Sequence, residues 1–234
     1  MFNVLAAPGE VFTEIKERPV EHSNWLIPGV VWTIVGMAMV FLLFSQEWAM
    51  REISKAQTKA MEQQVAKGKM TQQAADQAEQ MMKKIMPVMV KVGGSIATAL
   101  YAFGSPFFWG FIIWFLGVKI FKADFEYMKA VEAAGLANIV YILTAIVSTL
   151  ISLVLGKLTY LSLAFFLSEF DFTNKMHFAM AAVNPFYLWF AGVIASATAI
   201  LSGVSWMKAA AWIFGMWLLT RALFILIGMG QFVM

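Results

Sequence analysis

Long stretches without a single charged residue are the feature that most limits what this chain can fold into. No Asp, Glu, Lys or Arg occurs between Glu21 and Glu47, or between Glu132 and Lys157. Charged residues make up only 13% of the 234 residues, about half the share found in soluble domains. Since lipid offers no hydrogen bonds to the backbone, such segments cross a membrane as helices. The sequence therefore predicts an all-α, polytopic transmembrane bundle.

Five stretches are long enough to cross a bilayer core of about 30 Å. The expected spans are residues 25–45, 92–118, 133–156, 185–204 and 209–229. Trp25 and Trp48 bracket the first span in the manner of interfacial anchors. Residues 1–24 are expected to form an N-terminal interfacial segment, and residues 119–132 a short charged loop. Residues 157–184 form a connection whose apolar part, 158–167, either prolongs the third span, re-enters the membrane or lies on its surface.

The second expected span has a helix-breaking sequence near its middle. Gly104 and Pro106 flank a serine there, and this predicts a kink or an unwound turn. A kink of this sort serves helix packing in one interpretation. In the other, a broken helix marks the substrate site of a transporter.

Residues 46–90 differ sharply from the spans on either side and are rich in Gln, Ala, Lys, Glu and Met, which favour helix. Gly68 interrupts them, and Thr71 is suited to cap a second helix. Apolar residues recur at spacings of three and four in each half. This predicts an antiparallel helical hairpin that reaches about 27 Å beyond the membrane; the alternative is a flexible, partly helical linker. Residual apolar stripes on thin helices are typical of partner contacts, and the candidate contact residues are Ile53, Ala56, Ala60, Ala78, Met81 and Ile85.

Motifs for catalysis and cofactor binding are missing from the sequence. It has no Cys, and the patterns HExxH, GxSxG and GxxxxGK[ST] do not occur. His22 and His177 stand far apart, which makes a metal site improbable. The net charge of +3 is spread over several loops and gives no basic face for nucleic acid. We therefore expect neither enzymatic activity nor a cofactor, metal site or nucleic-acid partner.

Two polar residues inside or at the edge of the spans are candidates for a functional role. Arg221 lies thirteen residues after Lys208 within the last span. Charges at such depth are costly and are treated as functional hypotheses; the alternative is that Arg221 reaches towards the interface. Asn184 precedes Pro185 at the expected start of the fourth span, where this pair is typical of a helix beginning.

Five segments carry the pattern of a known membrane family. They are 8–12 (PGEVF), 125–134, 161–164 (LSLA), 184–189 (NPFYLW) and 205–210 (SWMKAA). Together they resemble the YIP (Ypt/Rab-interacting protein) family, and its bacterial branch in particular. The resemblance implies a five-span bundle with a cytoplasmic N-terminus and no catalytic residues. Eukaryotic members act in trafficking through small GTPases and membrane shaping, and some bacterial members work beside ABC-type exporters.

Charge and resemblance give opposite orientations for the bundle. With five spans, the side that holds the hairpin carries ten Lys and Arg residues and the N-terminal side carries six. The positive-inside rule therefore places the hairpin in the cytoplasm, whereas the resemblance places it outside.

From these observations, the sequence predicts a non-enzymatic scaffold or accessory subunit in the bacterial inner membrane. Its expected partners are the lipid bilayer and a protein, such as an ABC-type exporter, its adaptor or trafficking machinery. The alternative is a small-solute or lipid transporter that uses the second span and Arg221.

Overall fold

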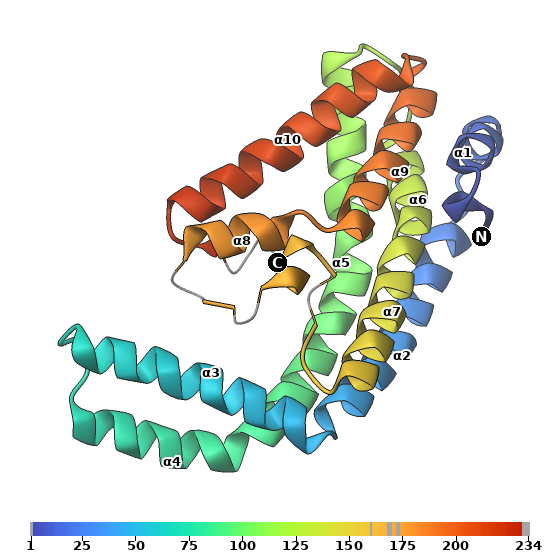
Figure 1. The fold of residues 1–234 in the computed structure, drawn as a ribbon. Helices are drawn as coiled ribbons and strands as arrows, with labels where there is room; N and C mark the ends of the chain where they lie inside the picture. The colour runs from blue at the N-terminus through green and yellow to red at the C-terminus, as the bar shows by residue number, and fades with distance from the viewer. Residues whose placement is uncertain (1, 160, 168–169, 172–173, 231–234) are drawn as a thin grey trace.

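The computed structural model describes residues 2–159, 161–167, 170–171 and 174–230. All regular structure in these ranges is helical (Figure 1). Five segments are long and apolar enough to cross a membrane, as the sequence predicted. They are Ser23–Phe44, Gln72–Ile120, Tyr127–Leu155, Pro185–Ser202 and Trp206–Leu226.

Four helical segments pack closely into one bundle. They are α2 (Ser23–Phe44), α5 (Gly94–Trp114), the pair α6 (Tyr127–Ala137) and α7 (Ile139–Leu155), and α9 (Pro185–Ser202). Small residues allow the close approach: a Cβ added at Gly110 of α5 would lie 2.9 Å from the Cα of Val131, and Gly135 faces the backbone of Trp25 in the same way. Helix–helix contacts in lipid depend on such small residues because no hydrophobic effect drives them.

The N-terminal segment is fixed to one end of this bundle. Helix α1 (Pro8–Glu17) begins with proline in its first turn and buries Phe12 and Ile15. It packs against α9, where the Lys16 ammonium donates a hydrogen bond of 2.8 Å to the carbonyl of Ile200. Amphipathic spacing thus docks α1 on protein.

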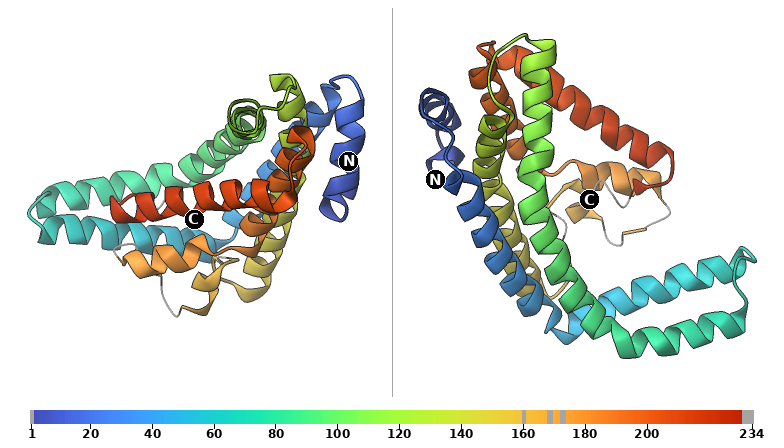
Figure 2. Two further views of the ribbon diagram at one scale, coloured as in Figure 1. Left: turned by 90° about the horizontal axis from the view of Figure 1, so that it is seen from above. Right: turned by 180° about the vertical axis from the view of Figure 1, so that it is seen from behind.

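The last span, α10 (Trp206–Leu226), leans away from the bundle in Figures 1 and 2. It contacts α9 and the short helix α8 (Lys175–Ala182). Ser205 caps its first turn by accepting from the backbone N–H of Lys208. Much of its apolar surface is exposed, as at Leu219 and Leu226, and is left to lipid or to another protein.

Two spans extend beyond the bounds expected from sequence. The third begins at Tyr127, so the expected loop of residues 119–132 ends several residues earlier. The second forms the C-terminal part of a 49-residue helical segment, Gln72–Ile120. This segment contains π-helical turns at Met89–Gly93 and Phe115–Ile120.

The expected break in the second span differs from what the structure contains. Helix α5 runs without an unwound turn through Gly104 and Pro106. The change of direction lies instead where α4 meets α5, around the π-helical turn Met89–Gly93 (Figure 2). Insertion of an extra residue into a helical turn is a common cause of such bends.

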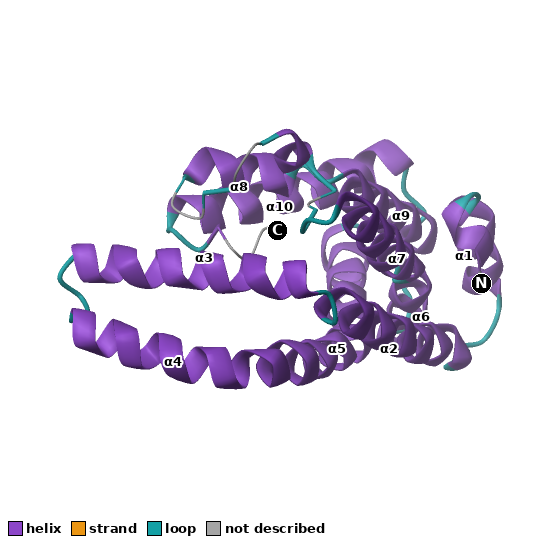
Figure 3. Ribbon diagram, turned by 60° about the horizontal axis from the view of Figure 1, so that its bottom comes forward, coloured by secondary structure: helices purple, strands orange, loops and turns teal. Residues whose placement is uncertain are grey.

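The insertion between the first two spans is a helical hairpin. Its arms are α3 (Glu47–Ala66) and α4 (Gln72–Val88), which lie side by side in Figure 3. Gly68 takes a left-handed conformation with φ of +67° at the turn, which glycine adopts without steric cost. Thr71 caps α4 by accepting from the backbone N–H of Ala74 at 3.2 Å. The sequence predicted a hairpin that reaches beyond the membrane. In the structure, the arms run across the direction of the spans (Figures 1 and 2).

The connection after α7 turns back along the bundle. Helix α7 ends at Gly156, which has a φ of +63°, so the apolar segment that follows does not prolong it. A 3₁₀ turn at Leu163–Phe166 and helix α8 follow. The Lys175 ammonium donates to the carbonyl of Leu226 at 2.9 Å, which ties α8 to the end of α10 (Figure 1).

Candidate functional site

The two arms of the hairpin meet through a thin line of small and flexible side chains. Ser54 and Thr58 of α3 line the space between the arms, opposite Met82 and Met86 of α4. Ala75 is also buried there. Methionine fills irregular gaps of this kind. The remaining surface of both arms forms two flanks, one on each side of the hairpin.

On both arms, one flank carries apolar side chains and the other carries charged ones. On α3, the apolar Ile53 and Ala60 precede the inward-facing Ser54 and Met61, and the charged Lys55 and Glu62 follow them. On α4, Met81 and Lys83 bracket Met82 in the same order. Consecutive helical residues are separated by about 100°, and antiparallel arms are related by a two-fold axis perpendicular to their plane. Residues that precede an inward-facing position therefore lie on one flank of the hairpin.

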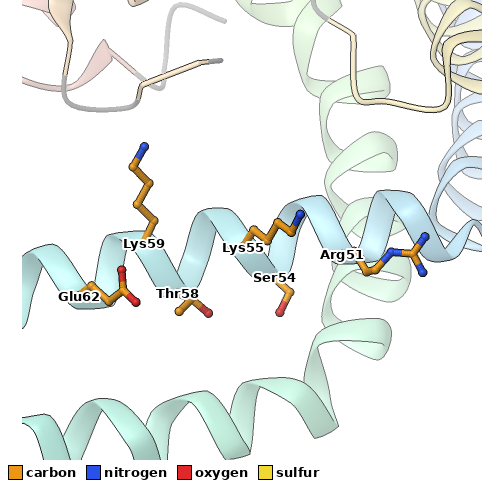
Figure 4. Close-up of a pocket in the computed structure, with 6 residues that line it drawn as sticks. All are labelled: Arg51, Ser54, Lys55, Thr58, Lys59 and Glu62. Atoms are coloured by element: carbon orange, nitrogen blue, oxygen red, sulfur yellow. The ribbon is translucent and has the colours of Figure 1, made fainter. Parts of the chain in front are cut away.

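The charged flank of α3 carries Arg51, Lys55, Lys59 and Glu62. A surface hollow of about 500 Å³ lies over it. Arg51 forms an ion pair of 3.1 Å with Glu47 one turn away. In Figure 4, Ser54 and Thr58 point towards α4, while Lys59 points the opposite way. The residues that line the hollow are Arg51, Ser54, Lys55, Thr58, Lys59 and Glu62.

The six predicted contact residues share the other flank, which we call the apolar flank. Met81 and Ile85 on α4 are exposed, and Ala60 on α3 is exposed as well. The structure therefore brings together residues that two separate stripes of the sequence contributed. Whether a protein covers them stays a prediction. The full set is Ile53, Ala56, Ala60, Ala78, Met81 and Ile85.

Arg221 lies in an aromatic environment on the inner side of α10. Its guanidinium carbon is 4.9 Å from the ring centroid of Trp217 and 5.8 Å from that of Tyr187 on α9, close enough for cation–π attraction. Its Nε is buried without a hydrogen-bond partner, and so is Nε1 of Trp217. Among the described residues, Arg221 has no carboxylate within salt-bridge distance. The cation is thus held by aromatic faces.

Asn184 has a structural task in this fold. Its side-chain oxygen accepts from the backbone N–H of Phe186 at 2.9 Å and so caps α9. Another asparagine, Asn138, escaped notice in the sequence although it is fully buried. It separates α6 from α7 and donates to the Ser105 hydroxyl of α5 at 2.7 Å. The serine between Gly104 and Pro106 therefore serves a helix contact.

A buried ion pair is the strongest polar feature that sequence reasoning missed. The sequence predicts that Lys129 and Glu132 lie in a loop, yet both are buried on α6, with their charged atoms 2.7 Å apart. The Lys129 ammonium also donates to the carbonyls of Ile15 at 3.0 Å and Arg18 at 2.9 Å. Asn24 of α2 donates to the second oxygen of Glu132 at 2.7 Å. The network joins the N-terminal segment, α2 and α6. The spacing of three residues between Lys129 and Glu132 was the only sign of this ion pair in the sequence.

A family model described as the Yip1 domain matches residues 2–229 of the chain. The match includes all five spans and the hairpin. No curated protein and no solved structure matches.

Proposed function

The chain belongs to the Yip1 domain family, and on that premise we propose that it is a non-enzymatic membrane scaffold or accessory subunit. The observation that carries the proposal is the charged flank of α3. Arg51, Lys55 and Lys59 repeat along one side of the helix beside an accessible hollow. Lys55 and Lys59 on this side are exposed, and a partner protein would reach them beside the edge of the arm contact, where Ser54 and Thr58 lie.

The chemistry of this flank favours an acidic partner surface. Three basic side chains and two hydroxyls line the hollow together with the carboxylate of Glu62, and a second carboxylate, Glu47, is paired with Arg51. Complementary charge steers association and fixes the register between partners. The resemblance noted above favours an ABC-type exporter, its adaptor or trafficking machinery as the partner, and the bacterial inner membrane as the location.

The transporter alternative draws less support from the polar groups inside the bundle. Glu132 is already paired with Lys129 and hydrogen-bonded to Asn24, and Arg221 is covered by aromatic rings. The helix that would need to break, α5, is continuous. These features fit structural roles, which supports the scaffold.

Affinity purification from native membranes in mild detergent, with quantitative mass spectrometry, tests the proposal. A triple variant with Arg51, Lys55 and Lys59 each replaced by Glu should lose a partner that the wild-type chain retains in stoichiometric amount. A matched control replaces three exposed glutamines of α4, Gln73, Gln77 and Gln80, by Glu and should keep it.

Two results would overturn the scaffold. One is a wild-type chain that purifies without any stoichiometric partner. The other is substrate-dependent flux in proteoliposomes made from the chain alone, which would establish the transporter instead.

A further inference from the structure

An exposed apolar stripe runs from the hairpin into the second span without interruption. Its members are separated by four, four, three, four and four residues, and each is between 41% and 69% exposed. They belong to one helical segment, Gln72–Ile120. They are Met81, Ile85, Met89, Val92, Ile96 and Leu100.

Part of this stripe lies on the second span, with Val92 in the π-helical turn Met89–Gly93 and Ile96 and Leu100 on α5. Val92, Ile96 and Leu100 lie on a helix that is long and apolar enough to cross a membrane, and their exposed side chains have acyl chains as solvent. Met81 and Ile85 precede them along the same helical segment at spacings of three and four residues, across the π-helical turn Met89–Gly93. The lipid-facing surface of the span is therefore continuous with the apolar flank of α4.

The second arm adds to the same surface. Ile53, Ala56 and Ala60 of α3 lie on the apolar flank, whereas Lys55 and Lys59 lie on the opposite one. A pair of helices with one apolar and one charged side is the pattern of an element that lies in a membrane interface.

The course of the hairpin matches this chemistry. The arms run across the spans at the end of the bundle where α2 finishes and α5 begins (Figures 1 and 2). The bend beside the π-helical turn Met89–Gly93 converts a crossing helix into one that lies along the surface. A hairpin projecting straight into water would need no such bend.

We propose that the hairpin lies in the membrane–water interface, with its apolar flank against phospholipid acyl chains and its charged flank towards water and headgroups. Lysine and arginine stems are long enough to reach headgroups from such a position. The inference concerns the chain alone in a bilayer and does not depend on the proposed scaffold role.

Collisional quenching of single fluorescent labels tests the proposal, and the absence of native Cys makes labelling simple. Ala60 and Met81 report the apolar flank, Lys59 and Lys83 the charged flank, and Leu100 the lipid-facing reference. Each is replaced by Cys, labelled with bimane and reconstituted into vesicles of phosphatidylcholine and phosphatidylglycerol. Nitroxide lipids should quench the apolar-flank labels nearly as much as the reference and several-fold more than the charged-flank labels. Iodide should give the reverse order.

Charge placed on either flank gives a second, independent measurement. Met81→Glu combined with Ile85→Glu should raise iodide quenching of a label at Ala60 to the level of the charged flank. Gln73→Glu combined with Gln80→Glu adds the same charge on the polar side of α4 and should leave it unchanged. Far-ultraviolet circular dichroism verifies that the helices persist in both.

Two outcomes would overturn the proposal. Equal iodide quenching on both flanks would mean that the hairpin projects into water. Apolar-flank labels shielded from both quenchers would mean that protein, here a second copy of the chain, covers that flank.

Discussion

Removal of one partner from the buried ion pair gives the sharpest test of how the N-terminal end of the bundle is held. Lys129→Met leaves the carboxylate of Glu132 charged at a site where its side chain is 2% exposed. It also removes the donor of hydrogen bonds to the backbone carbonyls of Ile15 and Arg18, at the C-terminal end of α1. Breaking a buried pair in this way costs about 3–5 kcal/mol of unfolding free energy.

The control is the exposed pair on the hairpin. Lys83 lies 2.8 Å from Glu79, and the two side chains are 63% and 35% exposed. Solvent screens this pair, so Lys83→Met should cost less than about 1 kcal/mol. The two variants remove the same ammonium group and differ in its burial and in the two carbonyl hydrogen bonds that Lys129 makes.

Equilibrium unfolding in mixed micelles titrated with sodium dodecyl sulfate, followed by Trp fluorescence, measures both costs. The double variant Lys129→Met with Glu132→Met should be less destabilised than the sum of the single variants, with a coupling of about 0.5–3 kcal/mol. It should still be less stable than wild type because Asn24 loses its acceptor. A cost for Lys129→Met no larger than that for Lys83→Met would refute the buried network.

Three further predictions concern packing, the intramembrane cation and topology. Gly110→Ala places a methyl group 2.9 Å from the backbone of α6 and should lower the unfolding free energy by about 1–3 kcal/mol in the same assay. As a control, a Cβ at Gly192 meets nothing within 4 Å, so Gly192→Ala should leave the unfolding free energy unchanged. Arg221→Gln removes the charge over two aromatic rings and should lower stability by about 0.5–2 kcal/mol; Arg221→Lys should recover part of this loss, and equal stability of all three proteins would place the guanidinium in water or headgroups. Cysteines introduced at Asn3 and Lys59 should react with a membrane-impermeant maleimide from opposite sides, because one span separates the N-terminus from the hairpin. Reaction of both from the same side would contradict the topology. In intact cells, the cysteine that reacts is the one on the outer side, which determines the orientation.

The sequence by itself determined which solvent each segment occupies. Uncharged runs of about 20 residues are typical of membrane spans, and this local property predicted five spans, which agree with the five helices of the structure that are long and apolar enough to cross a membrane. The hairpin followed from equally local signals: the capping Thr71, the left-handed Gly68 and stripes spaced by three and four. The match of a Yip1 domain model confirms the family that scattered aromatic and proline patterns suggested.

The tertiary structure decided what the polar residues do and which way the hairpin runs. Lys129 and Glu132 looked like loop charges because the groups that satisfy them lie far away in the chain, 108 residues in the case of Asn24. Gly104 and Pro106 suggested a kink or an unwound turn; the helix does not unwind there, and the segment bends around Met89–Gly93. Amphipathicity specifies that a helix has an apolar side but not what that side meets. Only the packing of distant segments supplies that second surface, which is why the two flanks of the hairpin could be distinguished only in the fold.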